Sequence, residues 1–174
     1  GPRDIVALVA PHAGYMASGP IAAYAYYNLA KDGKPDTIII FGPNHTGQGS
    51  ALSIMNEGAW RTPLGDVTID TETANHILKA SKIIDIDDRA HIYEHSIELQ
   101  LPFLAYLYDS EFKFVPICFM MQDLRTSQEV GKAVAIALKG KNALIIASSD
   151  MTHYEPQERP EKKDKLAIDA ALNL

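Results

Sequence analysis

Short apolar runs, rich in β-branched residues, recur along the chain and predict buried strands. The clearest runs are Ile5–Ala10, Thr37–Phe41, Lys113–Phe119 and Ala143–Ala147, and Ala51–Met55 is a further strand candidate. Such runs, bounded by Gly, Pro and Asn, are typical of parallel strands that are buried on both faces. The carboxyl ends of parallel strands meet at one edge of the sheet, where the active sites of such proteins lie.

Apolar residues at helical spacing fill the intervals between these runs. The first two predicted helices are Gly19–Lys31 and Thr71–Ala80, the second with Asp70 as its cap. A third predicted helix begins at the capping-box pattern Thr126–Glu129, continues through Leu138 and ends before Gly140. Trp60–Arg61 and Val67–Ile69 predict a hairpin appended to this core. The alternation of strand and helix predicts an α/β fold, with a mostly parallel β-sheet flanked by helices.

Two segments are less regular. Between His95 and Tyr108 an apolar stripe predicts a helix, and Pro102 requires either a kink or a helix start close to it. Residues 155–165 are charged and contain proline, which predicts a solvated loop ahead of a helix from Leu166 to Leu174. The short lead-in to the first strand and the uncapped last helix suggest that residues 1–174 form a single domain lacking N- and C-terminal parts.

Composition narrows the function classes. With 47% hydrophobic residues the 174-residue chain can bury a substantial core. Sixteen basic and 22 acidic residues give a net charge of −6, without a basic cluster interleaved with aromatics, so neither nucleic acid nor an anionic membrane is an expected partner. The single cysteine, Cys118, excludes an internal disulfide and is expected to pack in the core. Neither a signal peptide nor a membrane-spanning stretch is recognisable, so we expect a cytoplasmic location.

Three histidines follow three of the predicted strands. His12, His45 and His153 each lie just beyond an apolar run, within residues that favour turns. Neutral imidazole is the commonest protein ligand for metals, and two histidines from different strand ends leave open positions for a substrate. We interpret His12 and His45 as metal ligands because of this repeated placement at strand ends. It is the sole basis of the interpretation, since a local motif such as HExxH is missing.

His153 has neighbours that suit proton transfer. Asp150 and the pair Ser148–Ser149 precede it and are able to orient its ring, which favours a general acid/base role. A nucleophilic Ser-His-Asp arrangement is the competing interpretation, but the GxSxG elbow is missing, and Ser149 is more easily explained as hydrogen-bonding the turn.

The other histidines have simpler expectations. His95 lies at the beginning of a predicted helix, where its ring is able to face the same cleft. His91 is expected to be exposed to solvent, and His76 to lie on a helix surface. Most of the nearby tyrosines are expected to pack, with Tyr15 as the exception because it directly follows the His12 turn.

Four motifs in order resemble those of the Memo family, known in prokaryotes as AmmeMemoRadiSam system protein B. They are Pro11–Tyr15, Gly42–His45, Glu94–Glu98 with Leu101–Phe103, and Ser148–His153. The resemblance spans nearly the whole chain and implies a fold similar to that of class III extradiol dioxygenases, which are non-haem iron enzymes. It also implies that His12 and His45 bind the metal, that His153 is the acid/base, and that Asp150 and His95 line the same pocket.

The resemblance leaves metal and function open. Fe(II) is favoured by the dioxygenase analogy. In the family, however, a cysteine from a C-terminal Cys-Gly motif, which this chain lacks, replaces a carboxylate ligand and favours Cu or Zn. The chain alone is therefore expected to bind metal weakly. One hypothesis is a metal-dependent redox enzyme, with a radical SAM protein as a partner by family resemblance. The other is a non-catalytic module that binds a peptide or small ligand in the same cleft.

Overall fold

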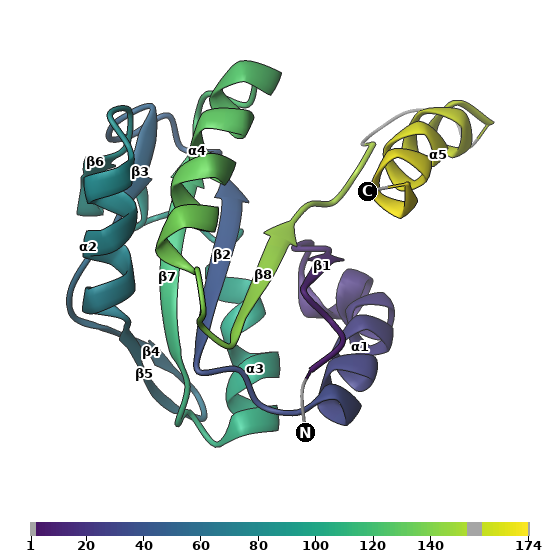
Figure 1. Cartoon of the computed structure of the whole chain (residues 1–174). Coiled ribbons are helices and arrows are strands. Elements are labelled where there is room, and N and C mark those ends of the chain that lie inside the picture. Colours follow the sequence, from purple (N-terminus) through teal and green to yellow (C-terminus); the bar gives the residue numbers. More distant parts are fainter. Residues whose placement is uncertain (1–2, 153–157, 174) are drawn as a thin grey trace.

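The computed structural model describes residues 3–152 and 158–173 and contains one central sheet (Figure 1). Its order is β1-β8-β2-β7-β3-β6, formed by β1 (Ala7–Ala10), β8 (Ala143–Ser148), β2 (Thr37–Pro43), β7 (Lys113–Phe119), β3 (Leu52–Ile54) and β6 (Asp85–Ile86). The first four strands of this order are parallel, and β3 is antiparallel to β7. The carboxyl ends of β1, β8 and β2 therefore lie at one edge.

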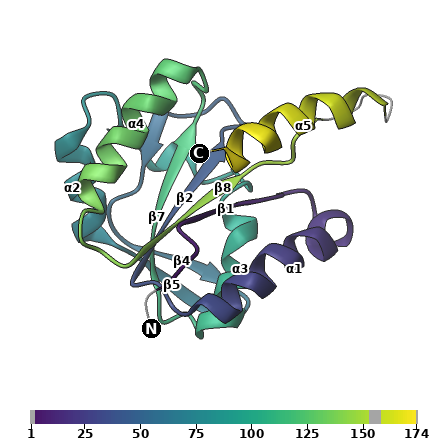
Figure 2. The ribbon, with the colours of Figure 1, turned by 45° about the vertical axis from the view of Figure 1, so that its right-hand side comes forward.

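Helices cover both faces of the sheet, as Figures 1 and 2 show. On one face lie α1 (Tyr15–Asp32) and α3 (Leu101–Tyr108), and on the other lie α2 (Thr71–Ala80) and α4 (Leu124–Ala137). Alternate residues of β2 belong to the two cores, since Ile38 and Ile40 pack on the α1 and α3 side whereas Ile39 packs on the α2 and α4 side. This two-sided burial explains why the strands are continuous apolar runs.

The hairpin of β4 (Ala59–Thr62) and β5 (Gly65–Ile69) is attached at the beginning of β7, where Thr68 pairs with Lys113. The predicted fold class, an α/β fold with a mostly parallel sheet flanked by helices and an appended hairpin, is confirmed. The bounds of α2 and the Asp70 cap are also as predicted, because the Asp70 side chain accepts a hydrogen bond from the Thr73 backbone at 3.0 Å.

The starts of α1, α4 and α3 differ from the prediction. The first helix begins at Tyr15, four residues before Gly19, and continues through Pro20. Helix α4 begins at Leu124, because Asp123 rather than Thr126 is its cap and accepts hydrogen bonds from the Thr126 backbone and hydroxyl. A 3-10 turn (Glu98–Gln100) precedes α3, so Pro102 lies in the first turn of that helix. Of the two predicted alternatives, a helix start close to Pro102 is therefore correct and a kink is not.

The prediction of a loop over residues 155–165 is wrong for the part that the structure describes, because α5 (Glu158–Leu172) occupies it. Proline within the first turn of a helix costs little, since the backbone N–H it lacks has no partner inside the helix there. Thr152 donates a hydrogen bond to Asp164 at 2.6 Å and ties this helix to the preceding segment. Within the described ranges, none of the helices combines the length and apolar character needed to cross a membrane.

Candidate metal centre

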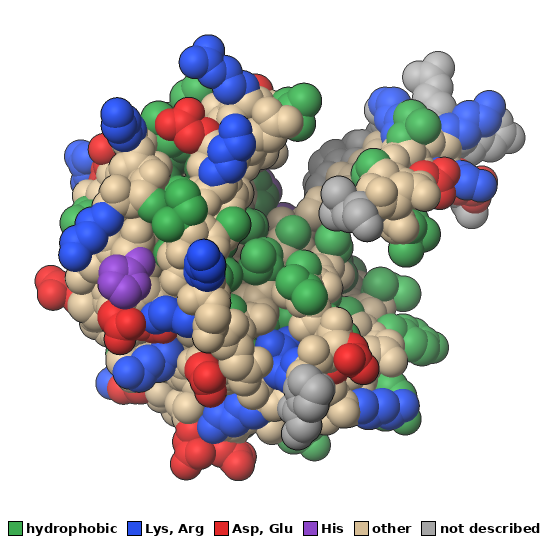
Figure 3. Space-filling model, viewed as in Figure 1, with side chains coloured by type: hydrophobic (Ala, Val, Ile, Leu, Met, Phe, Trp, Pro, Cys, Tyr) green, Lys and Arg blue, Asp and Glu red, His purple; other side chains and the backbone are tan. Residues whose placement is uncertain are grey.

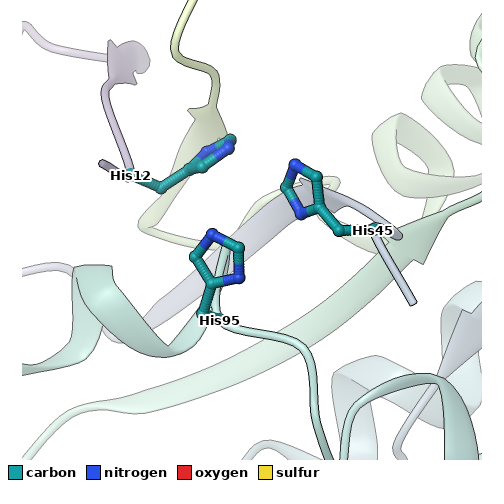
Figure 4. A group of neighbouring side chains, drawn as sticks. All are labelled: His12, His45 and His95. Carbon is teal, nitrogen blue, oxygen red and sulfur yellow. The ribbon is translucent and has the colours of Figure 1, made fainter. Parts of the chain in front are cut away.

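Three histidine rings face one another at the carboxyl edge of the sheet (Figure 4). His12 follows β1, His45 follows β2, and His95 comes from the loop that precedes α3. The ring centroids of His12 and His45 are 5.2 Å apart, those of His12 and His95 5.6 Å, and those of His45 and His95 4.8 Å. One nitrogen from each ring lies within 4.8 Å of the other two, so this cluster is able to hold a metal ion.

The three rings differ in their exposure to solvent. The His12 side chain is 3% exposed, whereas those of His45 and His95 are 43% and 50% exposed. Nitrogen ligands lie about 2.0–2.1 Å from a zinc ion, so two of them around one ion are at most about 4.2 Å apart. The ligand atoms, within 4.8 Å of one another, would approach by a few tenths of an ångström to meet this requirement.

Hydrogen bonds determine which His12 nitrogen is available. The single proton of the Ser148 hydroxyl is donated to the Ser96 carbonyl at 2.7 Å, and the same oxygen accepts from the Gln100 amide at 2.9 Å. Tyr26 orients the Gln100 amide, because the Tyr26 hydroxyl donates a hydrogen bond to Gln100 Oε1 at 2.6 Å. The Ser148 oxygen at 2.9 Å from His12 Nδ1 is thus an acceptor, which places the proton on Nδ1 and leaves the Nε2 lone pair free.

Glu94 fixes the His45 ring in the same tautomer. Its carboxylate, almost completely buried, accepts hydrogen bonds from His45 Nδ1 at 2.9 Å and from the backbone N–H groups of His45, His95 and Ser96. Burial acts to raise the pKa of Glu94, but the hydrogen bonds from His45 and Ser96 outweigh it and lower that pKa to about 2. An ionised carboxylate is only an acceptor, so His45 Nδ1 carries the proton and its Nε2 is free.

Asp150 contacts the turn that carries His12. Its carboxylate accepts hydrogen bonds from the backbone N–H groups of His12 and Ala13, and its second oxygen lies 3.7 Å from His12 Nε2. Burial lowers the pKa of His12, with Asp150 opposing this effect, so the ring favours the neutral form that binds metals. His153, the predicted acid/base, lies outside the described residues.

The structure thus brings together His12 and His45, as their strand-end positions predicted, and adds His95. The resemblance placed His95 in the same pocket with the catalytic residues and not with the metal ligands. The strand pattern gave no signal for it, because its loop follows no strand. The supporting roles of Glu94 and Gln100 were missed, since both act through long-range contacts. Ser148, which the sequence suggested as a partner that orients His153, contacts His12.

The predictions for Cys118 and His76 are confirmed, and the prediction for His91 is wrong. Cys118 is buried in the core, and burial raises the pKa of its thiol to about 12, while His76 is exposed on α2. His91, expected in solvent, is 5% exposed and packs edge-to-face against Trp60, which the hairpin brings over it. Burial accordingly lowers the pKa of His91 to about 4.

The fold and the histidine cluster define an α/β protein with a candidate metal site at the carboxyl edge of a mostly parallel sheet. Comparison with known families identifies the family: the model of the Memo-like protein family matches residues 2–174. The chain belongs to the Memo family.

Several relatives are named as MEMO1 family proteins. The chain is 50% identical to the one from Sulfurisphaera tokodaii over 175 residues, which is 99% of this chain and 62% of that protein. It is 51% identical to the one from Methanopyrus kandleri over 176 residues, with 100% and 62% covered, and 54% identical to the one from Sulfolobus acidocaldarius over 168 residues, with 95% and 59% covered. The chain therefore spans about three fifths of these relatives.

A solved structure supports the fold alone. The crystal structure of the uncharacterized protein JW3007 from Escherichia coli K12 superposes on this chain with a TM-score of 0.59 at 17% sequence identity, and the match covers 87% of this chain and 62% of that one.

Proposed function

We propose that this chain binds one divalent metal ion through Nε2 of His12, Nε2 of His45 and a ring nitrogen of His95, and that the site belongs to a metal-dependent redox enzyme. The observation that carries the proposal is the pair of fixed tautomers, since both leave an Nε2 lone pair on rings that face one another. A neutral three-imidazole set suits Fe, Zn and Cu, and the resemblance to dioxygenases favours Fe(II).

The chain itself supplies the surroundings of the ion. When bound, Fe(II) supplies redox chemistry and Lewis acidity. Asp150 fixes the backbone of His12 by accepting two N–H bonds, and Glu94 does the same for His45 and His95. In this proposal His153 transfers protons, the role that the family resemblance implies for it. The proposed substrate or peptide partner reaches the ion from the open side, where His45 and His95 are half exposed.

Metal titration of the tag-free, chelator-treated chain tests the proposal. Co(II) serves as a spectroscopic probe and Fe(II) is added anaerobically. We expect a stoichiometry of one ion, and a loss of affinity of at least about 100-fold for each of the substitutions His12→Ala, His45→Ala and His95→Ala, because each removes one of three ligands. His76→Ala, on the surface of α2, is the matched control and should bind normally.

Two results would contradict this assignment. Unchanged affinity in His95→Ala would restrict the site to the two histidines that the sequence predicted. For His153→Ala, we expect unchanged metal content, with a loss of about 10²–10⁴-fold in any oxygen consumption if it is the acid/base. Loss of the metal in that variant would show that His153 is a ligand.

A further inference from the structure

A cavity of about 330 Å³ opens on the α4 face of the sheet, at the carboxyl ends of β2, β7 and β8. Its lining residues are all uncharged: Phe41, Gly42, Pro43, Phe119, Gln122, Ser127, Val130, Gly131, Ala147, Ser148 and Ser149. The rings of Phe41 and Phe119 meet edge-to-face at 5.5 Å in its lining. Figure 3 shows charged side chains on the side of α4 that faces the viewer.

This cavity lies beside the histidine cluster at the carboxyl edge of the sheet. Pro43 of its lining lies two residues before His45, and the hydroxyl of Ser148, another lining residue, is 2.9 Å from His12 Nδ1. A molecule held in the cavity would therefore rest against β2, which His45 follows, and against β8, whose Ser148 contacts His12. Ligands of open α/β sheets bind outside the carboxyl ends of the strands, and cavities that bind small molecules are mostly apolar with a few polar groups.

Gly131 of α4 contributes to the lining of this cavity. It lies inside α4, where glycine is less favourable than alanine. A Cβ atom at Gly131 would meet nothing within 4 Å, so crowding by neighbours does not explain the glycine. A large side chain at this position would instead extend over the cavity that Gly131 lines.

We infer that the cavity binds the apolar body of a small uncharged molecule, with the Ser127 and Ser149 hydroxyls and the Gln122 amide at its polar end. This inference rests on the proposed function, because it assigns the cavity as the subsite that holds the substrate of the metal site. The absence of charged side chains from the described lining selects against ionic ligands, since nothing there would offset the cost of removing a charge from water.

A pair of matched probes tests the inference. 4-Methylbenzyl alcohol and 4-methylbenzoate have the same ring and methyl group, and they differ in charge. In NMR titrations of the chain, we expect the alcohol to shift the signals of the lining residues and to bind at least about tenfold more tightly than the benzoate. Gly131→Leu should weaken binding of the alcohol at least about tenfold, whereas Gly131→Ala and the control Ala135→Leu, one turn further along α4, should leave it unchanged.

Equal binding of both probes, or no effect of Gly131→Leu, would overturn the inference. Apparent affinity for the alcohol that falls as the protein concentration rises would identify a second copy of the chain as the occupant and would also overturn it. Co(II) separates this result from the metal proposal: bound at the histidines, it should enhance the relaxation of the probe's methyl protons. Normal relaxation with Co(II) bound would refute the subsite, whereas failure of Co(II) to bind would refute only the metal proposal.

Discussion

At the scale of single residues, the two nitrogens of an imidazole have separate tasks. Nδ1 of His12 is held by a serine hydroxyl and Nδ1 of His45 by a carboxylate, so on both rings the Nε2 lone pair remains available. Partners of this kind fix ring orientation and raise the basicity of the ligand nitrogen. Metal titration of single variants measures the contribution of these partners.

Glu94→Gln tests the carboxylate. The amide keeps the shape of the side chain but removes the charge, and its NH₂ group faces donors that already need an acceptor. We expect metal affinity to fall about 10–100-fold. The matched control is Glu98→Gln, the same change at an exposed position four residues further along the chain. Calorimetric titration of both variants with Zn(II) gives the comparison, and equal affinities would show that Glu94 has no influence on the ligands.

Ser148→Ala tests the hydroxyl. Its removal leaves His12 Nδ1, the Gln100 amide and the Ser96 carbonyl without a shared partner in a buried region. An unsatisfied buried group costs about 1–3 kcal/mol, so we expect the free energy of unfolding in urea to fall by about that amount. We also expect weaker Co(II) binding, whereas Ser149→Ala, at the next position, should have a smaller effect on both. Unchanged stability and Co(II) binding would mean that water replaces the hydroxyl.

At the scale of elements, close contact between β2 and the loop before α3 positions the site. A Cβ atom at Gly42 would lie 2.5 Å from the Ser96 hydroxyl oxygen and 2.7 Å from Ile97 Cγ1, so only glycine allows this approach. The loop that Gly42 admits carries both Glu94 and His95. Strand and loop therefore fit together as one unit, although nothing in the hydrophobic pattern links them.

Gly42→Ala should push the loop before α3 away from β2. Overpacking of a buried contact costs about 1–3 kcal/mol, and displacement of the loop should weaken metal binding as well. The same substitution at Gly131, where a Cβ atom meets nothing within 4 Å, should instead stabilise α4 by about 0.5–1 kcal/mol. Urea unfolding of the two variants measures both effects. Similar stability changes at the two positions would contradict the packing explanation.

Elements were predictable where a single local signal decides them. Continuous apolar runs predicted the strands, and Asp70 predicted the start of α2. Helix starts were misplaced where two caps competed, as at Asp123 and Thr126, because Thr126 suits a cap but is itself capped. The error at α5 arose because charge and proline are shared by loops and by the first turn of a surface helix.

At the scale of the whole molecule, only part of the site was predictable. His12 and His45 follow strands, so sheet topology alone brings them to one edge. His95 joins them because β2 packs against a loop more than fifty residues further along the chain, and the sequence pattern carries no signal for that contact. As a result, the cluster that is able to hold a metal ion contains three histidines, where the strand pattern predicted two.

The burial of His91 makes the stability of the folded protein depend on pH. Because burial lowers its pKa from the ordinary 6.5 to about 4, the unfolded chain takes up a proton in this range that the folded protein excludes. The stability contributed by the neutral ring is fully present above about pH 6.5 and is lost as the pH falls toward 4. This loss amounts to about 3 kcal/mol. The lowered pKa of His12 acts in the same direction.

His91→Phe isolates this effect, because it keeps an aromatic ring against Trp60 and removes the titrating group. Urea unfolding of both proteins at pH 7, 6, 5 and 4.5 gives the stability difference at each pH. We expect the variant to lose less stability than the original chain between pH 6.5 and 4.5, with the two curves drawing together or crossing on acidification. Parallel curves would show that the His91 ring is protonated inside the folded protein at its ordinary pKa, and that its burial does not control acid stability.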